Sequence, residues 1–334
     1  MPVHSYAAFG PREPLKPHTF ELGAVAPNDV EIAVSHCGIC HTDLHLIDND
    51  WGFSSFPLTP GHEAVGEVVA VGSAVKSFKR GDRVGIGWLA GSCGSCESCL
   101  EGHENTCAAW RPTCVAQPGG FADRLRADHR LTFEIPKEIK SEEAGPLMCG
   151  GATMFTPLED HDVKDGARVG IVSIGGLGHM GLQFARARGC RVTAFSTSPS
   201  KESEAREMGA SDFAVLSDSE AMNARAGSLD FIVTTTPSDL PWDTLIGLLK
   251  PRGTLCVVGI PPNAVQFQAF PLLATHKKIV GSNTGSVRGI KSMLATAAKK
   301  GVKPFIERHA MGDVNTALER LRKNEVRYRA VLVN

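Results

Sequence analysis

Four cysteines lie close together before the middle of the chain and could hold a metal ion. Cys93, Cys96 and Cys99 are each separated by two residues, and Cys107 follows after seven more. Four thiolates at this spacing can surround one tetrahedral ion, as in a closed structural zinc site. An iron–sulfur cluster and a pair of disulfides are the alternatives, but ferredoxin runs have a shorter last interval followed by proline, and Ala108 stands here. We therefore expect zinc in this run, with no part in turnover.

A second set of possible metal ligands is spread over the first 150 residues. Zinc that performs chemistry keeps three protein ligands and one free position, and we expect Cys40, His62 and Cys149 to supply them. Glu63 would orient this site or approach the metal transiently. Asp43 would accept the other ring N–H of His62 and fix its tautomer. The alternative is a set of ordinary buried thiols with a core histidine. The four-cysteine run and the glycine turn described below argue against it.

Two residues after Cys40 could carry a proton. If a helix begins at Cys40, Thr42 and His45 share one of its faces. We expect a relay in which an alkoxide passes its proton to Thr42, then to His45 and to solvent, because imidazole titrates near neutral pH. A solvated surface histidine is the alternative for His45. His41 is a candidate contact to a cofactor pyrophosphate.

A glycine-rich turn follows an apolar stretch at residues 169–173 and precedes a helical pattern at 177–188. Such a turn lets backbone N–H groups bind a pyrophosphate at the positive end of a helix. The G-x-G-x-x-G pattern fits in two frames, one with Ser173 in the first glycine position and one that begins later at Gly176. A tight strand–helix connection without a ligand is the alternative. The candidate pyrophosphate contacts are Gly175, Gly176, Leu177 and Gly178.

The residues about 20 positions further on indicate which dinucleotide binds. An NAD site places an acidic residue there against the ribose 2′-hydroxyl, whereas this chain has Ser196, Thr197 and Ser198, with Lys201 before the first acid, Glu202. Hydroxyls and a lysine suit a 2′-phosphate, which a carboxylate would repel. We therefore predict NADPH over NADH.

The order of predicted elements indicates how these residues are positioned. The first ~140 residues contain short strands and loops, for example at 65–71 and 83–86. Strands then alternate with helices, which predicts an α/β chain with a doubly wound parallel sheet. The predicted strands are 169–173, 191–195, 231–235, 254–259 and 278–282, and the predicted helices are 177–188, 201–208 and 242–249. Helical patterns at 289–300 and 314–322, and a strand at 329–333, are expected to return to the first domain.

Length and composition exclude several classes of protein. A chain of 334 residues predicts two domains, and its net charge of −1 offers no basic surface for nucleic acid. No apolar run approaches the ~20 residues of a membrane helix, and no secretory signal is visible. Ten cysteines without an export signal favour metal ligation over disulfides. The cytoplasm is the expected compartment.

Taken together, these motifs resemble those of the zinc-dependent medium-chain alcohol dehydrogenases, in particular the cinnamyl-alcohol-dehydrogenase-like branch with its bacterial NADPH-dependent aldehyde reductases. The matching segments run from one end of the chain to the other: 37–45, 60–63, 81–88, 92–107, 119–123, 146–153, 175–181 and 326–329. Two features depart from the family pattern. Ser173 replaces the usual first glycine, and residues 108–119 form a shorter segment than in the plant enzymes, so a bulky phenylpropenyl aldehyde need not be the substrate.

The resemblance implies a GroES-like, mostly β catalytic domain at residues 1–148 with both zinc sites. It implies a Rossmann NADP-binding domain at 149–284, a return segment at 285–334 and a homodimer. It supports Cys40, His62, Cys149 and Glu63 at catalytic zinc. It also places further residues near the cofactor: Thr153, Thr235, Val258, Gly259, Ser282 and Asn283.

The sequence thus predicts an enzyme with two zinc ions per chain that reduces aldehydes to primary alcohols, reversibly, by hydride transfer from NADPH. Trp51, Trp88 and Trp110 are candidates for the walls of a small-molecule pocket. Two other functions stay open at this point. One is a zinc-independent quinone or enone reductase of the same fold, and the other is a non-catalytic NADPH or zinc sensor.

Overall fold

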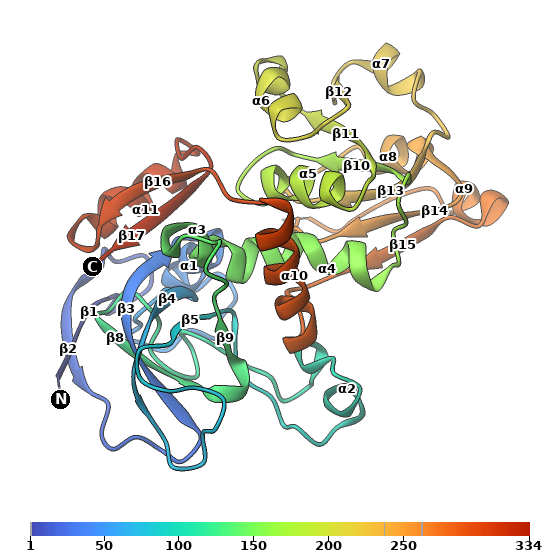
Figure 1. Ribbon diagram of the computed structural model, residues 1–334. Coiled ribbons are helices and arrows are strands. Elements are labelled where there is room, and N and C mark those ends of the chain that lie inside the picture. Colours follow the sequence, from blue (N-terminus) through green and yellow to red (C-terminus); the bar gives the residue numbers. More distant parts are fainter. Residues whose placement is uncertain (1, 237, 262) are drawn as a thin grey trace. The chain divides into compact units, whose positions relative to one another are not determined.

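The computed structural model describes residues 2–236, 238–261 and 263–334, and the chain forms two compact units (Figure 1). Unit 1 comprises Met1–Ala152, Thr284–Lys299 and Lys303–Asn334, and unit 2 comprises Thr153–Asn283 and Lys300–Val302. The chain thus leaves unit 1 once and returns to it near the C-terminus. Because the first boundary follows Ala152, Cys149 lies in unit 1 with the other expected metal ligands.

Unit 1 is built on a mostly antiparallel sheet of seven strands. The order is β16-β17-β3-β4-β5-β9, and β8 pairs with β3. Two small sheets, β1-β2 and β6-β7, complete the unit. Its strands are β1 (Pro2–Ala7), β2 (Lys16–Glu21), β3 (Asp29–Gly38), β4 (Glu63–Val71), β5 (Arg83–Ile86), β6 (Leu89–Gly91), β7 (Arg111–Pro112), β8 (Arg124–Asp128), β9 (Thr132–Glu134), β16 (Ile306–Ala310) and β17 (Arg329–Val333).

Short helices connect and cover these strands. They are α1 (His41–Asp48), α2 (Glu97–Leu100), η1 (Glu104–Thr106), η2 (His129–Leu131), α3 (Ser141–Pro146), η3 (Leu147–Gly151), α10 (Val287–Lys300), η5 (Met311–Asp313) and α11 (Val314–Arg322). Helix α11 buries Val314, Ala317, Leu318 and Leu321, which share one face of a helix. These side chains join the core formed by the alternating buried residues of β3 and by β4.

Unit 2 contains a six-stranded parallel sheet in the order β12-β11-β10-β13-β14-β15. The strands are β10 (Arg168–Val172), β11 (Arg191–Ser196), β12 (Asp212–Val215), β13 (Leu229–Thr234), β14 (Leu249–Val257) and β15 (Lys278–Gly281). The helices are α4 (Ala152–Asp160), α5 (Gly178–Ala187), η4 (Pro199–Lys201), α6 (Glu202–Glu207), α7 (Ser219–Asn223), α8 (Trp242–Leu248) and α9 (Ala269–Thr275). This order confirms the predicted doubly wound sheet.

The strand order reverses between β10 and β13, which are neighbours in the sheet although β11 and β12 separate them in the chain. Right-handed crossovers therefore place the connecting helices of the two halves on opposite faces. Strand β10 has four buried residues in a row, at positions 169–172. This is expected of a strand that is covered on both faces of the sheet. The switch point at the carboxyl ends of β10 and β13 is where such sheets bind ligands.

After residue 150, two of the described strands were not predicted from the sequence. Strand β12 has only four residues and begins with Asp212, and β16 carries Glu307, Arg308 and His309 among its five. Both lie at the edges of their sheets, where polar side chains reach solvent, so the apolar pattern that reveals inner strands is weak. Among the described helices, none is both long and apolar enough to cross a membrane.

Candidate active site and metal centres

Asp43 organises the first cluster of polar groups in unit 1. Its fully buried carboxylate accepts hydrogen bonds from the N–H of Cys40 (2.8 Å), the N–H of Gly61 (3.0 Å) and Nδ1 of His62 (3.1 Å). It lies in the first turn of α1, and Cys40 is the residue before that helix. Because a carboxylate only accepts, His62 must carry its proton on Nδ1. The other ring nitrogen, Nε2, is then free to act as a ligand.

Nε2 of His62 is buried and has no hydrogen-bond partner among the described residues. Ligand atoms of Cys40, His62, Glu63 and Cys149 all lie within 4.8 Å of one another. A buried acceptor without a donor is costly unless a cation occupies the space between these groups. Two thiols and an imidazole, with a carboxylate close by, are the donors that zinc prefers. The residues present therefore fit the ion expected here.

The electrostatics of this cluster also favour a cation. Burial lowers the pKa of His62, but the charges of Asp43 and Cys149 outweigh it, so the net pKa lies well above the usual value. The contact with Cys149 lowers the pKa of Cys40, and the same contact raises that of Cys149. The thiolate form is thus favoured at Cys40 and the thiol form at Cys149. The raised pKa of His62 shows that the negative groups around it favour positive charge, which a divalent ion would supply.

Glu63 has an ionic partner that the sequence did not reveal. The Arg329 guanidinium of β17 donates to its Oε1, and both side chains are buried. Burial raises the pKa of Glu63 to about 7, although the positive charge of Arg329 acts in the opposite direction. A Cβ on Gly38, which pairs with Glu63 across β3 and β4, would lie 2.0 Å from Oε2, so the carboxylate needs a glycine there. Arg329 therefore holds the acid beside the metal ligands.

Cys149 and Cys114 reach the cluster from different parts of the chain. Cys149 lies in η3, a π-helical turn of the kind often found at functional sites. The Cys114 thiol lies within 4.8 Å of ligand atoms of Asp43 and His62. Burial raises the pKa of Cys114 to about 11, so this thiol keeps its proton. Cys114 was not predicted as a site residue, because no other possible ligand lies at a metal-binding spacing from it in the sequence.

The predicted relay residues lie on helix α1, which starts where it was expected. Thr42 is half-buried and His45 lies three residues later on the same side of the helix. Nδ1 of His45 bonds to the Asp50 carboxylate at 2.9 Å, and the His45 ring stacks on Trp51 with centroids 5.1 Å apart. Because Nδ1 bonds to Asp50, Nε2 of His45 is the ring nitrogen left for a relay. His41, the first residue of the helix, is exposed.

The three tryptophans named as candidates form one aromatic cluster. Trp88 meets the His62 ring edge-to-face at 5.3 Å and contacts Trp110 at 5.9 Å. Trp51 lies 6.4 Å from Trp88, so the cluster reaches from His62, the predicted ligand, to His45, the predicted relay residue. These rings provide an apolar wall beside the metal ligands.

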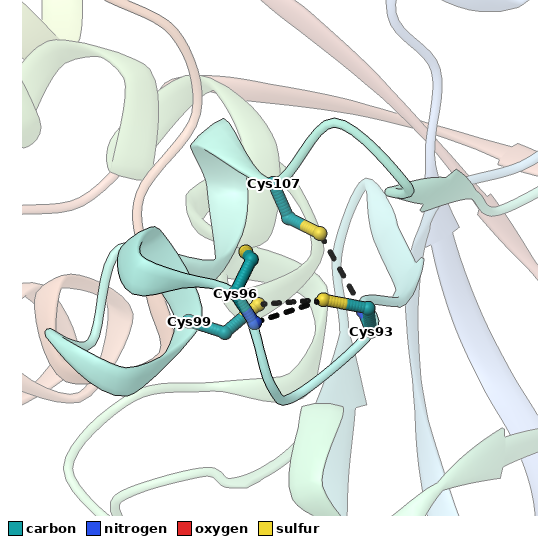
Figure 2. Close-up of side chains that lie close together, drawn as sticks. All are labelled: Cys93, Cys96, Cys99 and Cys107. Carbon is teal, nitrogen blue, oxygen red and sulfur yellow. Dashed lines mark hydrogen bonds between the residues drawn. The ribbon is translucent and has the colours of Figure 1, made fainter.

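The four-cysteine run forms the second cluster, shown in Figure 2. Its sulfur atoms lie within 4.8 Å of one another, and Cys93 Sγ is 3.9 Å from Cys99 Sγ. Cys93 N–H donates to Cys107 Sγ at 3.5 Å, and Cys96 N–H donates to Cys93 Sγ at 3.3 Å. The backbone N–H groups of Ser95 and Cys96 lower the pKa of Cys93 to about 6. All ten cysteines, each in the described part of the chain, are free of disulfides. This donor set fits a closed zinc site.

The glycine turn follows β10 in unit 2, and its geometry distinguishes the two possible frames. Ser173 has φ +74°, in the left-handed region, so its backbone adopts the conformation expected of the first glycine. A Cβ on Gly178 would lie 1.9 Å from the Ser173 carbonyl oxygen, which is the close helix–strand packing of the third glycine. A Cβ on Gly175 would meet nothing within 4 Å. The frame that begins at Ser173 therefore matches all three roles. Gly176 and Leu177 are half-buried beside it.

The end of β11 carries hydroxyl groups where an NAD site has an acid. Ser196 is the last residue of β11 and its Oγ accepts the N–H of Ser198 at 3.1 Å. Lys201 Nζ donates to the Ile174 carbonyl at 2.6 Å, which places the ammonium beside the glycine turn. The Glu202 carboxylate is engaged by Arg206 on the same helix.

The other predicted cofactor contacts in unit 2 gather mostly at the carboxyl edge of the sheet. Thr235 Oγ1 donates to the carbonyls of Val172 and Ser173, which joins the ends of β13 and β10 at the switch point. The N–H groups of Val258 and Gly259 bond to Thr234, and Ser282 N–H bonds to Val257. Asn283 follows Ser282, while Thr153 is the second residue of α4 and is half-buried.

Comparison with known proteins finds a family match in each of the two units. Residues 26–137 match the model of the alcohol dehydrogenase GroES-like domain, and residues 176–299 match that of the zinc-binding dehydrogenases. The chain is 40% identical over 330 residues to the aldehyde reductase AdhA of Synechocystis sp., with 99% of this chain and 98% of that protein covered. It is 43% identical over 336 residues to a probable cinnamyl alcohol dehydrogenase of Nicotiana tabacum, with 98% and 94% covered.

The chain belongs to the zinc-binding alcohol dehydrogenases. It is thus an alcohol/aldehyde oxidoreductase of the medium-chain dehydrogenase fold, as predicted. Among solved structures, this dehydrogenase is similar to a cinnamyl alcohol dehydrogenase of Sorghum bicolor, with a TM-score of 0.95 at 40% identity, over 100% of this chain and 98% of that one. It is also similar to the Helicobacter pylori enzyme complexed with NADP(H), with a TM-score of 0.92 at 31% identity, over 100% and 98%.

Three residues that contact the predicted site residues of this alcohol dehydrogenase were not predicted from the sequence: Asp50, Cys114 and Arg329. Asp50 is five residues from His45, a spacing too loose to identify a partner without the turn that ends α1. Arg329 lies 266 positions from Glu63, and only the pairing of β17 with β3 brings them together. An arginine in an otherwise apolar strand was the one available signal.

Proposed function

We propose that this alcohol dehydrogenase reduces aldehydes to primary alcohols, reversibly, with NADPH as hydride donor. The observation that carries the proposal is the buried Nε2 of His62, which has no partner among the described residues and lies beside the Cys40 and Cys149 thiols. Zinc bound there would act as a Lewis acid on the carbonyl oxygen, and NADPH would supply the hydride. Turnover of aldehydes with NADPH, followed at 340 nm, tests the reaction directly.

The chain's own residues would prepare and complete this chemistry. Asp43 holds the His62 tautomer, and Arg329 keeps Glu63 at the edge of the ligand set. Thr42 would take up or supply the proton at the substrate oxygen and His45 would exchange it with solvent. We assign unit 1 as the catalytic domain and unit 2 as the cofactor domain.

We propose two zinc ions per chain, one held by Cys40, His62 and Cys149 and one by the four-cysteine run. Metal analysis should find about two zinc ions in the wild-type chain. Cys149→Ala should lose one of them and its activity. Cys96→Ala should lose the other, with reduced stability. A wild-type content near one, or a content unchanged by Cys149→Ala, would refute the assignment.

The preference for NADPH is supported by Ser196, Ser198 and Lys201 at the end of β11, with no free carboxylate among them. We expect kcat/KM to be at least about tenfold higher with NADPH than with NADH, as one lost phosphate contact is worth about one factor of ten. Lys201→Ala should raise KM for NADPH and leave KM for NADH unchanged. Lys164→Ala, at an exposed ion pair of the same unit, is the control. Equal use of both cofactors would refute the preference.

The pyrophosphate would lie on the turn of Gly175, Gly176, Leu177 and Gly178 at the start of α5, where backbone N–H groups and the helix dipole favour an anion. The residues at the carboxyl edge of the sheet would line the rest of the cofactor site. These are Thr153, Thr197, Thr235, Val258, Gly259, Ser282 and Asn283, to which His41 of α1 is added.

The aromatic cluster supports an aldehyde with an apolar substituent as substrate. Trp88 presents ring surface next to His62, Trp51 and Trp110 extend it, and none of the three carries a charge. A panel from acetaldehyde to benzaldehyde and cinnamaldehyde should show kcat/KM rising with apolar surface. A preference for charged or sugar aldehydes would contradict the proposal.

Two competing functions make different predictions. A zinc-independent quinone or enone reductase would keep its activity after zinc removal, whereas this enzyme should lose it. A non-catalytic sensor would bind NADPH and zinc without turning over any aldehyde. The aldehyde panel with native and metal-free protein separates the three.

We also propose a cytoplasmic homodimer. Phe270 and Leu273 on α9 are 76% and 74% exposed, and β15, which follows α9 in the chain, is an edge strand of the unit 2 sheet. Large exposed apolar groups next to an unpaired strand edge favour association with a second copy. Ten free thiols suit a reducing compartment.

A further inference from the structure

The four-cysteine segment contacts the helix with which the chain re-enters unit 1. Residues 93–107, which we name the metal lobe, contain the turn η1 just before Cys107. Asn105 Nδ2 donates to the Thr284 carbonyl at 2.7 Å, and Glu104 Oε2 accepts the N–H of Val287 at 3.3 Å. Both contacts lie at the start of α10, and Figure 1 shows the segment around α2 at this end of the helix.

Glu104 accepts a hydrogen bond from the first turn of α10, in place of a residue of the helix itself. The first N–H groups of any helix lack partners inside it, and its N-terminus carries partial positive charge. In α10, Gly289 N–H bonds to Ser286 Oγ and Ile290 N–H to the Ser286 carbonyl. Val287 N–H instead bonds to the carboxylate of Glu104, which is 183 positions away in the chain. The start of α10 therefore depends on the position of η1.

The position of η1 depends in turn on the metal ligands. Within the metal lobe, residues 93–106 are exposed or half-buried, and only Cys107 is buried. The lobe thus has no apolar core to fix its shape. Cys107 ends η1, its N–H bonds to the Glu104 carbonyl, and its sulfur accepts the N–H of Cys93. A metal bound by the four thiolates would hold η1 between Cys99 and Cys107.

The contacts fall where the chain passes from one unit to the other. Unit 2 ends at Asn283 and unit 1 resumes at Thr284, the residue whose carbonyl Asn105 holds. Ser282 and Asn283, the two residues before this point, are assigned to the cofactor site. A change in η1 would therefore reach the cofactor-binding edge of β15 through the backbone itself.

We propose that Glu104 and Asn105 are positioning residues that couple the four-cysteine metal site to the start of α10 and, through residues 282–284, to cofactor binding. Metal in the lobe fixes the position of η1, and η1 fixes the first turn of α10. Residues 282–284, which precede this turn, are ordered with it. Because such coupling is reciprocal, bound cofactor must also strengthen retention of the lobe metal. The cofactor half of this inference rests on the function proposed above.

Hydrogen exchange tests the structural half without cofactor or turnover. In the zinc-loaded full chain, Glu104→Ala and Asn105→Ala should each raise exchange at residues 284–290 about fivefold, the factor that a lost helix cap is worth. Glu104→Gln keeps an acceptor and loses the charge, so its exchange rate should lie between those of the alanine variants and the wild type. Glu101→Ala, an exposed acid of the same lobe, should match the wild type. Unchanged exchange in both alanine variants, with zinc content intact, would overturn the proposal.

Loss of zinc to a chelator tests the coupling to cofactor. In the zinc-loaded full chain with Cys149→Ala, which silences the other zinc site, NADPH should slow metal loss from the four-cysteine site severalfold. Glu104→Ala in that background should abolish the slowing. NADPH that binds without any slowing would refute the coupling. A chain that binds no NADPH but shows the faster exchange would refute the proposed cofactor and keep the link between lobe and helix.

Discussion

At the scale of single residues, the site depends on buried acids that each have a defined set of donors. Asp43 receives three hydrogen bonds and Glu63 receives the guanidinium of Arg329. A buried carboxylate is tolerated only when it is paired in this way. Each acid lies beside a residue to which we assign a role in the chemistry, so changes at their partners should have large and separable effects.

Asp50→Asn should impair proton transfer and leave the metal sites intact. The amide no longer holds the His45 imidazole in the tautomer that its carboxylate selects, so kcat/KM should fall about tenfold or more. Zinc content and unfolding free energy should stay unchanged. Asp48→Asn, at the last residue of α1 and in an ion pair with Arg322 of α11, is the matched control and should keep full activity. A wild-type pH–rate profile for Asp50→Asn would contradict the role of Asp50.

Arg329→Ala should destabilise the protein strongly. It leaves Glu63 buried without its cation, which costs about 3–5 kcal/mol of unfolding free energy. The pKa of Glu63, already about 7 because of burial, should rise further. Urea denaturation of the metal-free protein measures the loss. The double variant Glu63→Gln with Arg329→Met should recover much of it, and a loss below about 1 kcal/mol in the single variant would show that the pair is not essential.

At the scale of elements, the turn between β10 and α5 departs from the family pattern at one residue. Ser173 adopts φ +74°, a conformation that costs a non-glycine residue about 1 kcal/mol. Ser173→Gly should therefore raise the unfolding free energy by up to about 1 kcal/mol, less the entropy that glycine adds to the unfolded chain. Thermal denaturation measures the change. Ser173→Ala should give no such gain, and a destabilised glycine variant would show that the serine hydroxyl has its own role.

Two glycines of this turn should respond to alanine in different ways. Gly178→Ala places a methyl group 1.9 Å from the backbone oxygen of Ser173, so it should cost about 3 kcal/mol or more. Gly175→Ala meets no atom within 4 Å and should leave stability within about 0.5 kcal/mol. It should nevertheless weaken NADPH binding at least tenfold, because its Cβ would occupy the place of the pyrophosphate. Tight NADPH binding by Gly175→Ala would show that the pyrophosphate does not bind at this turn.

At the scale of the whole molecule, the exposed face of α9 predicts assembly. Sedimentation should give twice the chain mass of 35.6 kDa for the wild type. The double variant Phe270→Glu with Leu273→Glu should sediment as a monomer, because two charges would be buried in the interface. Leu100→Glu, an equally exposed leucine of the metal lobe, should stay dimeric. A dimeric double variant would place the interface on another surface.

Much of the architecture was predictable because its signals are local. The parallel strands of unit 2 are runs of apolar residues bounded by turns, and α1 begins at the cysteine where a helix was expected. The edge strands β12 and β16 were missed because their polar residues face solvent and give no pattern.

The sequence by itself determined which atoms could bind metal and cofactor, because thiols at fixed short spacing and a glycine turn before a helix are local arrangements. Only the tertiary structure decided which distant side chains complete them. Arg329 reaches Glu63 across 266 positions, and Glu104 reaches Val287 across 183. Strand pairing and chain return set such contacts, and these depend on the packing of whole sheets. No pattern of neighbouring residues encodes them.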